Sequence, residues 1–508
     1  MAVSLASVGI ASGAPGPGEG VAAGEGQGSR PVGAGADIGW KPCEEDPTAE
    51  CGALSLPVDW GEPGGERFDL QLARRRATDP DARIGSMVFG PGGPGDSGVD
   101  RIVGEGNIGR FSDRLRSRFD IVSFDPRGVG LSNPVRCSKE LLDRRPSPVM
   151  RSRAEFDATA RYNRELRADC RKNTDHGLFD HVDTLSMVKD LDAVRAALGE
   201  KSLTFHGSSY GTLLGEQYAE QYPERVRALV LEAVVDHSLG TGEFLSTQAA
   251  TLQDSFDEFV AWCGRTDSCA LHGSDVRALW AELLDRAGRG ELSYEGTALP
   301  PFDLNVMVMK RLYGPEWARL SKELRELGES TPPAEQATQA EGQEGQEGQE
   351  GQAGQTRQET ALADNAFEIF CQDWRLPVHG YQGYEQELRR VARIAPDMRY
   401  PRALMSVSAC LGAPEPGNPQ HRLKVRGSGT VLLTNAVHDP ASGYNWATHV
   451  AEQLGTSAVL HTYEGWGHGT YNSSPCVQDV VDAYLISLKV PPRGARCPAV
   501  EPAGFTAG

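Results

Sequence analysis

The chain has little positive charge and no long apolar segment. Its 51 lysines and arginines are outnumbered by 70 aspartates and glutamates, which gives a net charge of −19. The phosphates of nucleic acid would be repelled by such a chain. No stretch supplies the 18 or more continuous apolar residues that a membrane-spanning helix needs. We therefore expect neither a nucleic-acid partner nor a membrane span.

Metal-binding spacings are also missing. None of the ten cysteines forms a Cys-x-x-Cys motif, and no histidine-rich tract accompanies them, so we expect no metal. Their even number favours disulfides and an oxidising compartment, with reduced buried thiols as the alternative. Spacing does not establish connectivity, but pairing neighbours in sequence gives five candidate bridges: 43–51, 137–170, 263–269, 371–410 and 476–497.

The N-terminus indicates export. Residues 1–14 contain a short apolar run and small residues suited to signal cleavage, although the usual positive start is absent. We interpret this run as the remnant of an export signal, with a disordered tail as the alternative. The Gly/Pro/Ala-rich residues 15–36 should be disordered in either case. The chain is expected to be secreted, or associated with the cell wall.

Short apolar runs alternate with helical patterns after residue 37. The segments 51–59 and 68–74 read as a β-hairpin. Apolar residues spaced three or four apart predict a helix over 183–198, which Gly199 should end. This alternation predicts an α/β fold with a mostly parallel sheet covered on both faces. Six strands are expected, at 85–89, 119–124, 203–205, 226–235, 431–433 and 457–463.

The alternation of strands and helices lapses between residues 240 and 425. With the two hairpin strands counted, this stretch follows the sixth strand, at 226–235. This stretch is largely helical in pattern, as at 244–263, and shows no clear strand series. It also contains the tract 331–358 with EGQ repeats, which should be disordered. We expect a helical lid over the carboxyl ends of the strands, where an open α/β sheet binds its ligand. The predicted organisation is an N-terminal segment 1–36, core parts 37–239 and 426–508, and a lid at 240–425.

The strand predicted at 203–205 leads into Gly207-Ser208-Ser209-Tyr210-Gly211, a Gly-x-Ser-x-Gly motif followed by a helical pattern. The serine of such a motif lies on a strained turn, with its hydroxyl above the carboxyl end of the sheet. Side chains at 207 and 211 would collide with the neighbouring helix and strand. We predict that Ser209 is a nucleophile that forms an acyl-enzyme. In a chain with 59 glycines, a simple glycine-rich turn is the alternative.

A glycine-rich loop, GPGGPGDSG at 90–98, follows the strand predicted at 85–89. Such a loop can turn its backbone N–H groups into a site that no side chain fills. We predict that Gly93 and Tyr210 each donate one N–H to an oxyanion. A phosphate-binding loop is the alternative, but the Gly-Lys-Ser/Thr ending of such loops is absent.

A histidine and an acid follow Ser209 in the expected order. His468 lies in Gly-Trp-Gly-His-Gly, directly after the last apolar run, where flanking glycines let the backbone bring the imidazole to the serine. Asp439 follows the run 431–436 and is the predicted acid; it would orient His468 without taking the proton itself. Asp236, which follows the run 226–235, is the alternative acid.

Several motifs in this order resemble the secreted tripeptidyl aminopeptidases of actinomycetes, which are α/β-hydrolases related to prolyl aminopeptidases. The resemblance covers about residues 40–497, and the family often has Asn at Gly90 and Leu-Asp-Gly at 231–233. It implies an α/β-hydrolase fold with Ser209, Asp439 and His468 as the triad and Gly93 with Tyr210 as the oxyanion site. The segments that carry it are GPGGPGDSG (90–98), FDPRGVGLS (124–132), DTLSMVKDLDAVRAALG (183–199), GSSYGTLLGEQYAEQYPERV (207–226), TNAVHDPAS (434–442) and GWGHG (465–469).

The same resemblance implies release of short peptides, commonly tripeptides, from free N-termini, without a metal or cofactor. A carboxylate should bind the substrate ammonium, because a buried cation needs a partner. Glu232 is our candidate because it follows the sixth strand, and Asp373 and Glu243 are alternatives. A carboxylesterase or lipid-ester hydrolase on the same scaffold is the alternative function, since a triad acts equally on esters. A catalytically inactive binding protein is the third possibility.

Overall fold

The computed structural model describes residues 37–330 and 361–502. The predicted signal remnant and disordered segment at 1–36, and the tract at 331–358, lie outside these residues.

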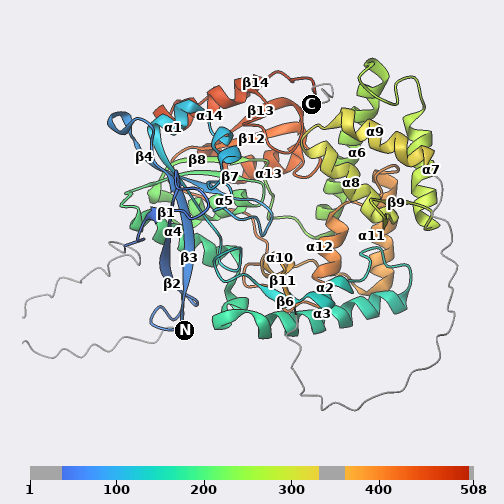
Figure 1. Ribbon diagram of the computed structural model, residues 1–508, viewed down its shortest axis with the longest axis horizontal. Helices are drawn as coiled ribbons and strands as arrows, with labels where there is room; N and C mark the ends of the chain where they lie inside the picture. Colours follow the sequence, from blue (N-terminus) through green and yellow to red (C-terminus); the bar gives the residue numbers. More distant parts are fainter. Residues whose placement is uncertain (1–36, 331–360, 503–508) are drawn as a thin grey trace, which may run out of the picture.

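A ten-stranded sheet forms the centre of the molecule, in the order β1-β2-β3-β5-β4-β7-β8-β12-β13-β14 (Figure 1). The pairs from β1 to β5 are antiparallel, and the pairs from β5 to β14 are parallel. The sheet strands are β1 (Lys41–Pro42), β2 (Glu50–Pro57), β3 (Arg67–Arg75), β4 (Gly85–Gly90), β5 (Phe119–Phe124), β7 (Leu203–Ser208), β8 (Val226–Glu232), β12 (Val431–His438), β13 (Ala458–Trp466) and β14 (Arg496–Cys497).

The predicted hairpin and all six predicted strands are therefore present, and among the six only the strand at 119–124 has both ends as predicted. The strand predicted over 226–235 ends at Glu232, because Ala233 has a left-handed backbone (φ 56°) that breaks the extended conformation. The strand predicted over 431–433 continues to His438. This extension carries the chain to Asp439 at the carboxyl edge of the sheet.

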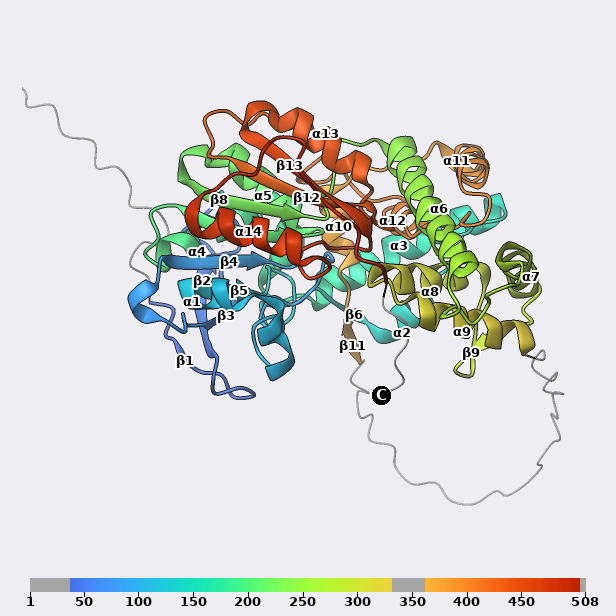
Figure 2. The ribbon, with the colours of Figure 1, turned by 90° about the horizontal axis from the view of Figure 1, so that it is seen from above.

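Helices cover both faces of the sheet, as a parallel sheet requires (Figure 2). One face packs against α1 (Asp113–Arg118) and α14 (Pro475–Ser487), and the other against α4, α5 and α13. The predicted helix at 183–198 is α4; Asp183 caps its first turn, and Gly199 follows with φ 75°. The three helices on this second face are α4 (Thr184–Ala197), α5 (Gly211–Gln221) and α13 (Tyr444–Leu454). Short 3-10 turns lie at Pro80–Ala82, Glu105–Arg110, Asp175–His181, Pro223–Arg225 and Gly455–Ser457.

Between β8 and β12 the chain leaves the sheet and forms a helical insertion with its own core, on the right in Figure 1. Aromatic side chains such as Phe256, Trp280 and Trp317 fill that core. No helix of the described residues is long and apolar enough to cross a membrane. The insertion contains α6 (Thr241–Arg265), α7 (Val276–Gly288), β9 (Ser293–Tyr294), β10 (Thr297–Ala298), α8 (Pro301–Tyr313), α9 (Trp317–Glu329), β11 (Leu362–Asp364), α10 (Phe367–Asp373), α11 (Gly380–Ile394) and α12 (Ala403–Ala409).

Two contacts of the insertion were not expected from the sequence. Strand β11 pairs antiparallel with β6 (Arg136–Ser138), a segment that precedes the nucleophile motif. Helix α3 (Arg153–Asn173), which follows the short helix α2 (Lys139–Asp143), packs against α11. Residues 136–173 therefore belong to the same side of the molecule as the insertion.

All ten cysteines are paired, and all five predicted pairings are confirmed. Two of the bridges hold the insertion side together, one between β6 and α3 and one from α10 to the end of α12. Their closed loops are short to moderate in length, so each bridge mainly restricts the unfolded chain locally. The five bridges are Cys43–Cys51, Cys137–Cys170, Cys263–Cys269, Cys371–Cys410 and Cys476–Cys497.

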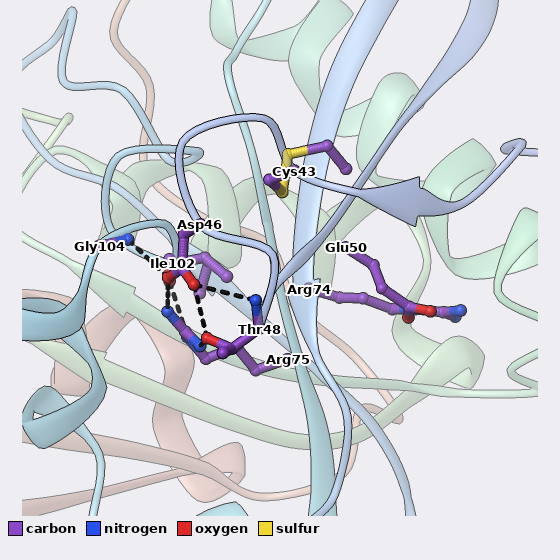
Figure 3. Close-up of a disulfide and its surroundings, with 9 residues drawn as sticks. Cys43, Asp46, Thr48, Glu50, Arg74, Arg75, Ile102 and Gly104 are labelled. Carbon is purple, nitrogen blue, oxygen red and sulfur yellow. Dashed lines mark hydrogen bonds and ion pairs between the residues drawn. A yellow bond between two sulfur atoms is a disulfide. The ribbon is translucent and has the colours of Figure 1, made fainter.

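The first disulfide closes a loop that contains a buried carboxylate, Asp46 (Figure 3). Asp46 accepts hydrogen bonds from the hydroxyl and N–H of Thr48 (2.5 and 3.0 Å) and from the N–H of Gly104 (3.0 Å). It also pairs with Arg75. The Thr48 hydroxyl is the main cause that lowers the pKa of Asp46 to about 2, against the opposing effect of burial. Asp46 thus joins the edge of the sheet to the loop after β4.

Asp46→Asn should lower the free energy of unfolding at neutral pH by about 1–3 kcal/mol, because an amide replaces a charged acceptor and leaves Arg75 unpaired. The folded pKa lies below the ordinary 3.8, so this stabilisation is complete above that value and is lost as the pH falls towards 2. Urea unfolding measured from neutral to acid pH should show the two proteins converging. The exposed neighbour variant Glu45→Gln should unfold like wild type. A difference that does not change with pH would contradict this role.

Candidate active site

Ser209 lies on a sharp turn between β7 and α5. Its φ of 54° is left-handed, a strained conformation for a residue with a side chain. A Cβ at Gly207 would lie 2.5 Å from the Gly211 carbonyl oxygen, and one at Gly211 would lie 2.5 Å from the Gly90 carbonyl oxygen. Both glycines are therefore required by close backbone packing, as predicted. The turn holds Ser209 at the N-terminus of α5.

The acid and the histidine predicted from the sequence lie together. Asp439 directly follows β12, and His468 follows β13. The His468 Nδ1 lies 3.0 Å from both carboxylate oxygens of Asp439. A carboxylate only accepts hydrogen bonds, so Nδ1 carries the proton and Nε2 is left free to accept one. The N–H groups of Ala441 and Ser442 donate to Asp439 Oδ1 and fix the carboxylate.

Asp439 also sets the charge preference of the imidazole. Burial disfavours the charged ring, but the charge and hydrogen bond of Asp439 outweigh burial and raise the pKa of His468 above 6.5. Asp236, the alternative acid, contacts other residues. Its carboxylate accepts bonds from Ser238 and lies 3.3 Å from His449 Nδ1. The geometry therefore pairs His468 with Asp439.

Helix α8 of the insertion supports the imidazole from one side. The backbone N–H of His468 donates to the Tyr313 carbonyl oxygen (2.8 Å), and the two side-chain rings stack with centroids 4.8 Å apart. Gly467 and Gly469, with φ of 101° and 107°, allow the loop its path. The sequence contained no signal for Tyr313, because its helical context gives no indication of contact with a loop 155 positions later.

The glycine-rich loop approaches the serine closely. A Cβ on Gly92 would lie 3.1 Å from Ser209 Cβ, and Gly93 has a left-handed backbone with φ of 108°. Gly93, Ser209 and Tyr210 line one pocket. The Tyr210 hydroxyl donates to Asp373 Oδ2 (2.6 Å), which anchors the residue that follows the serine.

The pocket lies between the strand ends and the insertion. The core contributes residues such as Gly93, Ser209 and Ser442, and the insertion contributes a wall made of residues of α6, α8, α10 and α12 or of the positions directly before or after these helices. That wall is largely aromatic. The lining side chains from the insertion include Phe244, Gln248, Tyr313, Phe370, Trp374, Arg402 and Ser406.

The acids considered for the substrate ammonium do not line this pocket. Glu232, the candidate named first, has a buried carboxylate that accepts bonds from Tyr471 N–H (2.9 Å) and Thr470 Oγ1 (3.4 Å). Although burial opposes it, the neighbouring His206 and these bonds keep the pKa of Glu232 below 4.5. Asp373 is also fully buried and bonded to Thr184 and Tyr210.

Burial raises the pKa of Asp373 to about 7, with the bonds from Thr184 and Tyr210 acting in the opposite direction. Glu243 is exposed in the first turn of α6, beside the pocket residue Phe244. Among the three acids, Glu243 is the one that a ligand can reach from solvent.

One cluster of the described residues has the composition of a metal site: His461, Cys476 and Cys497. The two cysteines form a disulfide, so their thiolates are not available as ligands. The cluster is therefore a structural feature at the β13–β14 edge.

Known proteins resemble this chain over most of its length. A family model described as "alpha/beta hydrolase fold" matches residues 85–338, and one described as "TAP-like protein" matches residues 397–497. The serine protease Hip1 of Mycobacterium tuberculosis is 31% identical over 489 residues, 91% of each chain. The tripeptidyl aminopeptidase of Streptomyces lividans is 26% identical over 486 residues, 91% of this chain and 87% of that protein. Carboxylesterase B of M. tuberculosis is 30% identical over 467 residues, 89% and 86% of the two chains.

The His468–Asp439 pair can be tested without a substrate. Asp439→Asn should lower the pKa of His468, because the charge and hydrogen bond that chiefly oppose the effect of burial are then lost. Two-dimensional NMR of the imidazole nitrogens over a pH titration measures this directly. Asp236→Asn removes the alternative carboxylate and should leave the His468 titration unchanged. An unchanged titration in Asp439→Asn would contradict the pairing.

Proposed function

Because this chain belongs to the α/β-hydrolase family, together with Hip1 and the Streptomyces tripeptidyl aminopeptidases, we propose that it is a secreted serine exopeptidase. It is a serine hydrolase. The proposed activity is release of short peptides, tripeptides above all, from free N-termini. The observation that carries the proposal is the His468–Asp439 pair at the carboxyl edge of the sheet that also presents Ser209 to the pocket.

In the proposed mechanism, Ser209 Oγ attacks the scissile carbonyl carbon while His468 Nε2 takes the hydroxyl proton. The N–H groups of Gly93 and Tyr210 bind the oxyanion that forms. Collapse of this intermediate breaks the C–N bond, and His468 gives the proton to the leaving amine. Water, activated by His468, then hydrolyses the acyl-enzyme and restores Ser209. Asp439 stabilises the imidazolium and keeps its proton at Nδ1 throughout.

An exopeptidase also needs a site for the substrate ammonium. A tripeptide extends about 10 Å from its amine to the scissile carbonyl. The ammonium of such a substrate would therefore lie beyond the immediate surroundings of Ser209, and no carboxylate is among the described residues that line the pocket. Glu243, exposed at the start of α6, is the proposed partner for this cation.

Secretion is part of the proposal and is supported by the five disulfides. Disulfides of this kind persist in oxidising compartments outside the cytosol. They restrain both the edge of the sheet and the insertion.

An ester hydrolase is the second candidate function. The relative named carboxylesterase B matches nearly the whole chain, and the aromatic wall of the pocket suits an apolar acyl group. The triad chemistry is the same for both substrates, so the choice depends on which acyl groups the pocket accepts.

Ser209→Ala should lower kcat/KM for a tripeptidyl p-nitroanilide by about 10⁴-fold or more, because the nucleophile is lost. A fluorophosphonate should label Ser209 in the wild-type protein. Ser208→Ala, which removes the adjacent hydroxyl, should still be labelled. Retention of labelling and activity in Ser209→Ala would contradict the proposed nucleophile.

N-acetylation of the same tripeptidyl substrate should lower kcat/KM at least about tenfold, because it removes the ammonium that the exopeptidase must bind. A short-chain p-nitrophenyl ester measured beside it tests the second function. Equal rates on the free and acetylated peptides, together with faster turnover of the ester, would favour the ester hydrolase. Glu243→Gln should reduce the effect of acetylation if Glu243 is the partner.

A further inference from the structure

The pocket at Ser209 contains a single charged side chain among its described lining residues, and that side chain is a cation, Arg402. The other polar groups of the wall are neutral, such as Gln248 and Ser406. Aromatic rings occupy most of the remaining wall, including Phe370 and Trp374. A guanidinium beside such a wall is less well solvated than one on an open surface.

Arg402 has a defined place in the insertion. It immediately precedes α12, whose first N–H, that of Ala403, donates to Gln248 on α6. Gln248 itself lines the pocket, so this bond fixes the start of α12 to the pocket wall. The side chain of Arg402 is exposed, and no carboxylate of the described residues forms an ion pair with it. Its charge is therefore available to a molecule in the pocket.

Arg402 also lies near the reacting groups. Its guanidinium interacts with the Tyr313 hydroxyl and opposes the rise that burial causes in the pKa of Tyr313. Tyr313 stacks on His468, and the positive charge of Arg402 also acts to lower the pKa of that imidazole. Arg402 and Ser209 line the same pocket, so a group bound to Arg402 would lie near the bond that Ser209 attacks.

A cation at this position selects among substrates. An ammonium or a basic side chain placed directly beside Arg402 would be repelled, whereas a carboxylate there would gain a charge-assisted and bidentate partner. Arginine is better suited than lysine to this task, because its planar fork matches the two oxygens of a carboxylate.

We propose that Arg402 binds a carboxylate of the substrate close to the scissile bond and makes this protein selective for acidic peptides. The inference rests on the proposed function, since it takes the pocket to be the peptide site. The carboxylate can come from an aspartate or glutamate side chain next to the cleaved bond. It can also be the terminal carboxylate of a short leaving peptide. The chemistry recognised is the same in both cases.

Three matched substrate sets test the proposal, with products identified by mass spectrometry. The first two sets are C-terminally amidated hexapeptides that differ only in Asp against Asn, at the third or at the fourth residue. The third set is a neutral tetrapeptide with a free or an amidated C-terminus. Wild-type protein should prefer the acidic member of at least one set by about tenfold or more in kcat/KM. The set that shows the preference identifies the source of the carboxylate.

Arg402→Gln should reduce that preference to within about twofold, and Arg402→Lys should keep part of it because a point charge remains. Arg399→Gln is the matched control, since Arg399 is a nearby exposed arginine that donates to the Pro396 carbonyl oxygen and does not line this pocket. It should behave like wild type. An acidic preference that survives in Arg402→Gln would overturn the proposal.

Failure of the inference and failure of the proposed function give different results. Cleavage of the neutral peptides that depends on Ser209, without preference in any set, would overturn the role of Arg402 alone. Absence of Ser209-dependent cleavage of every peptide would remove the proposed function and the inference with it.

Discussion

The register between three neighbouring parallel strands is the constraint on which the site depends. Ser208 on β7 lies beside Glu232 on β8, which lies beside Thr434 on β12. Backbone bonds continue this alignment past the strand ends, from Ser209 N–H to the Glu232 carbonyl oxygen and from Ala233 N–H to that of Thr434. The segments that lead to the serine and to the acid are therefore aligned at the same edge of the sheet. A shift of one residue in either pair would turn the alternating side chains to the opposite face.

The histidine reaches this edge on a loop, so its position depends on side chains rather than on strand pairing. Asp439 holds the ring nitrogen of His468, and the Tyr313 carbonyl oxygen accepts from its backbone N–H. Glu232 accepts from the N–H of Tyr471 in the same loop. Sheet and insertion thus both support one imidazole. The insertion is part of the site as well as its cover, because removal of α8 would expose one face of the ring.

The two parts of the molecule contribute different properties to the pocket. The sheet edge supplies hydroxyl and backbone groups that suit acyl transfer on many substrates. The insertion supplies most of the aromatic wall and Arg402, the groups that we propose select the substrate. The disulfide between Cys371 and Cys410 joins α10 to the end of α12 and so restrains both contributors to that wall. Substrate choice can change through the insertion while the sheet edge stays the same.

The sequence by itself determined the features that depend on local backbone chemistry. Gly207 and Gly211 indicate the sharp turn at Ser209, because only glycine leaves room there. The apolar run that precedes Asp439 indicates that this residue follows a strand. The position of Glu232 outside the pocket lining could not be predicted, because it depends on which way the last side chain of a strand points. The contacts of Tyr313 and Arg402 could not be predicted either, since helical segments without a motif do not reveal their partners. Those contacts arise when residues far apart in the chain pack together, and only the tertiary structure decides that packing.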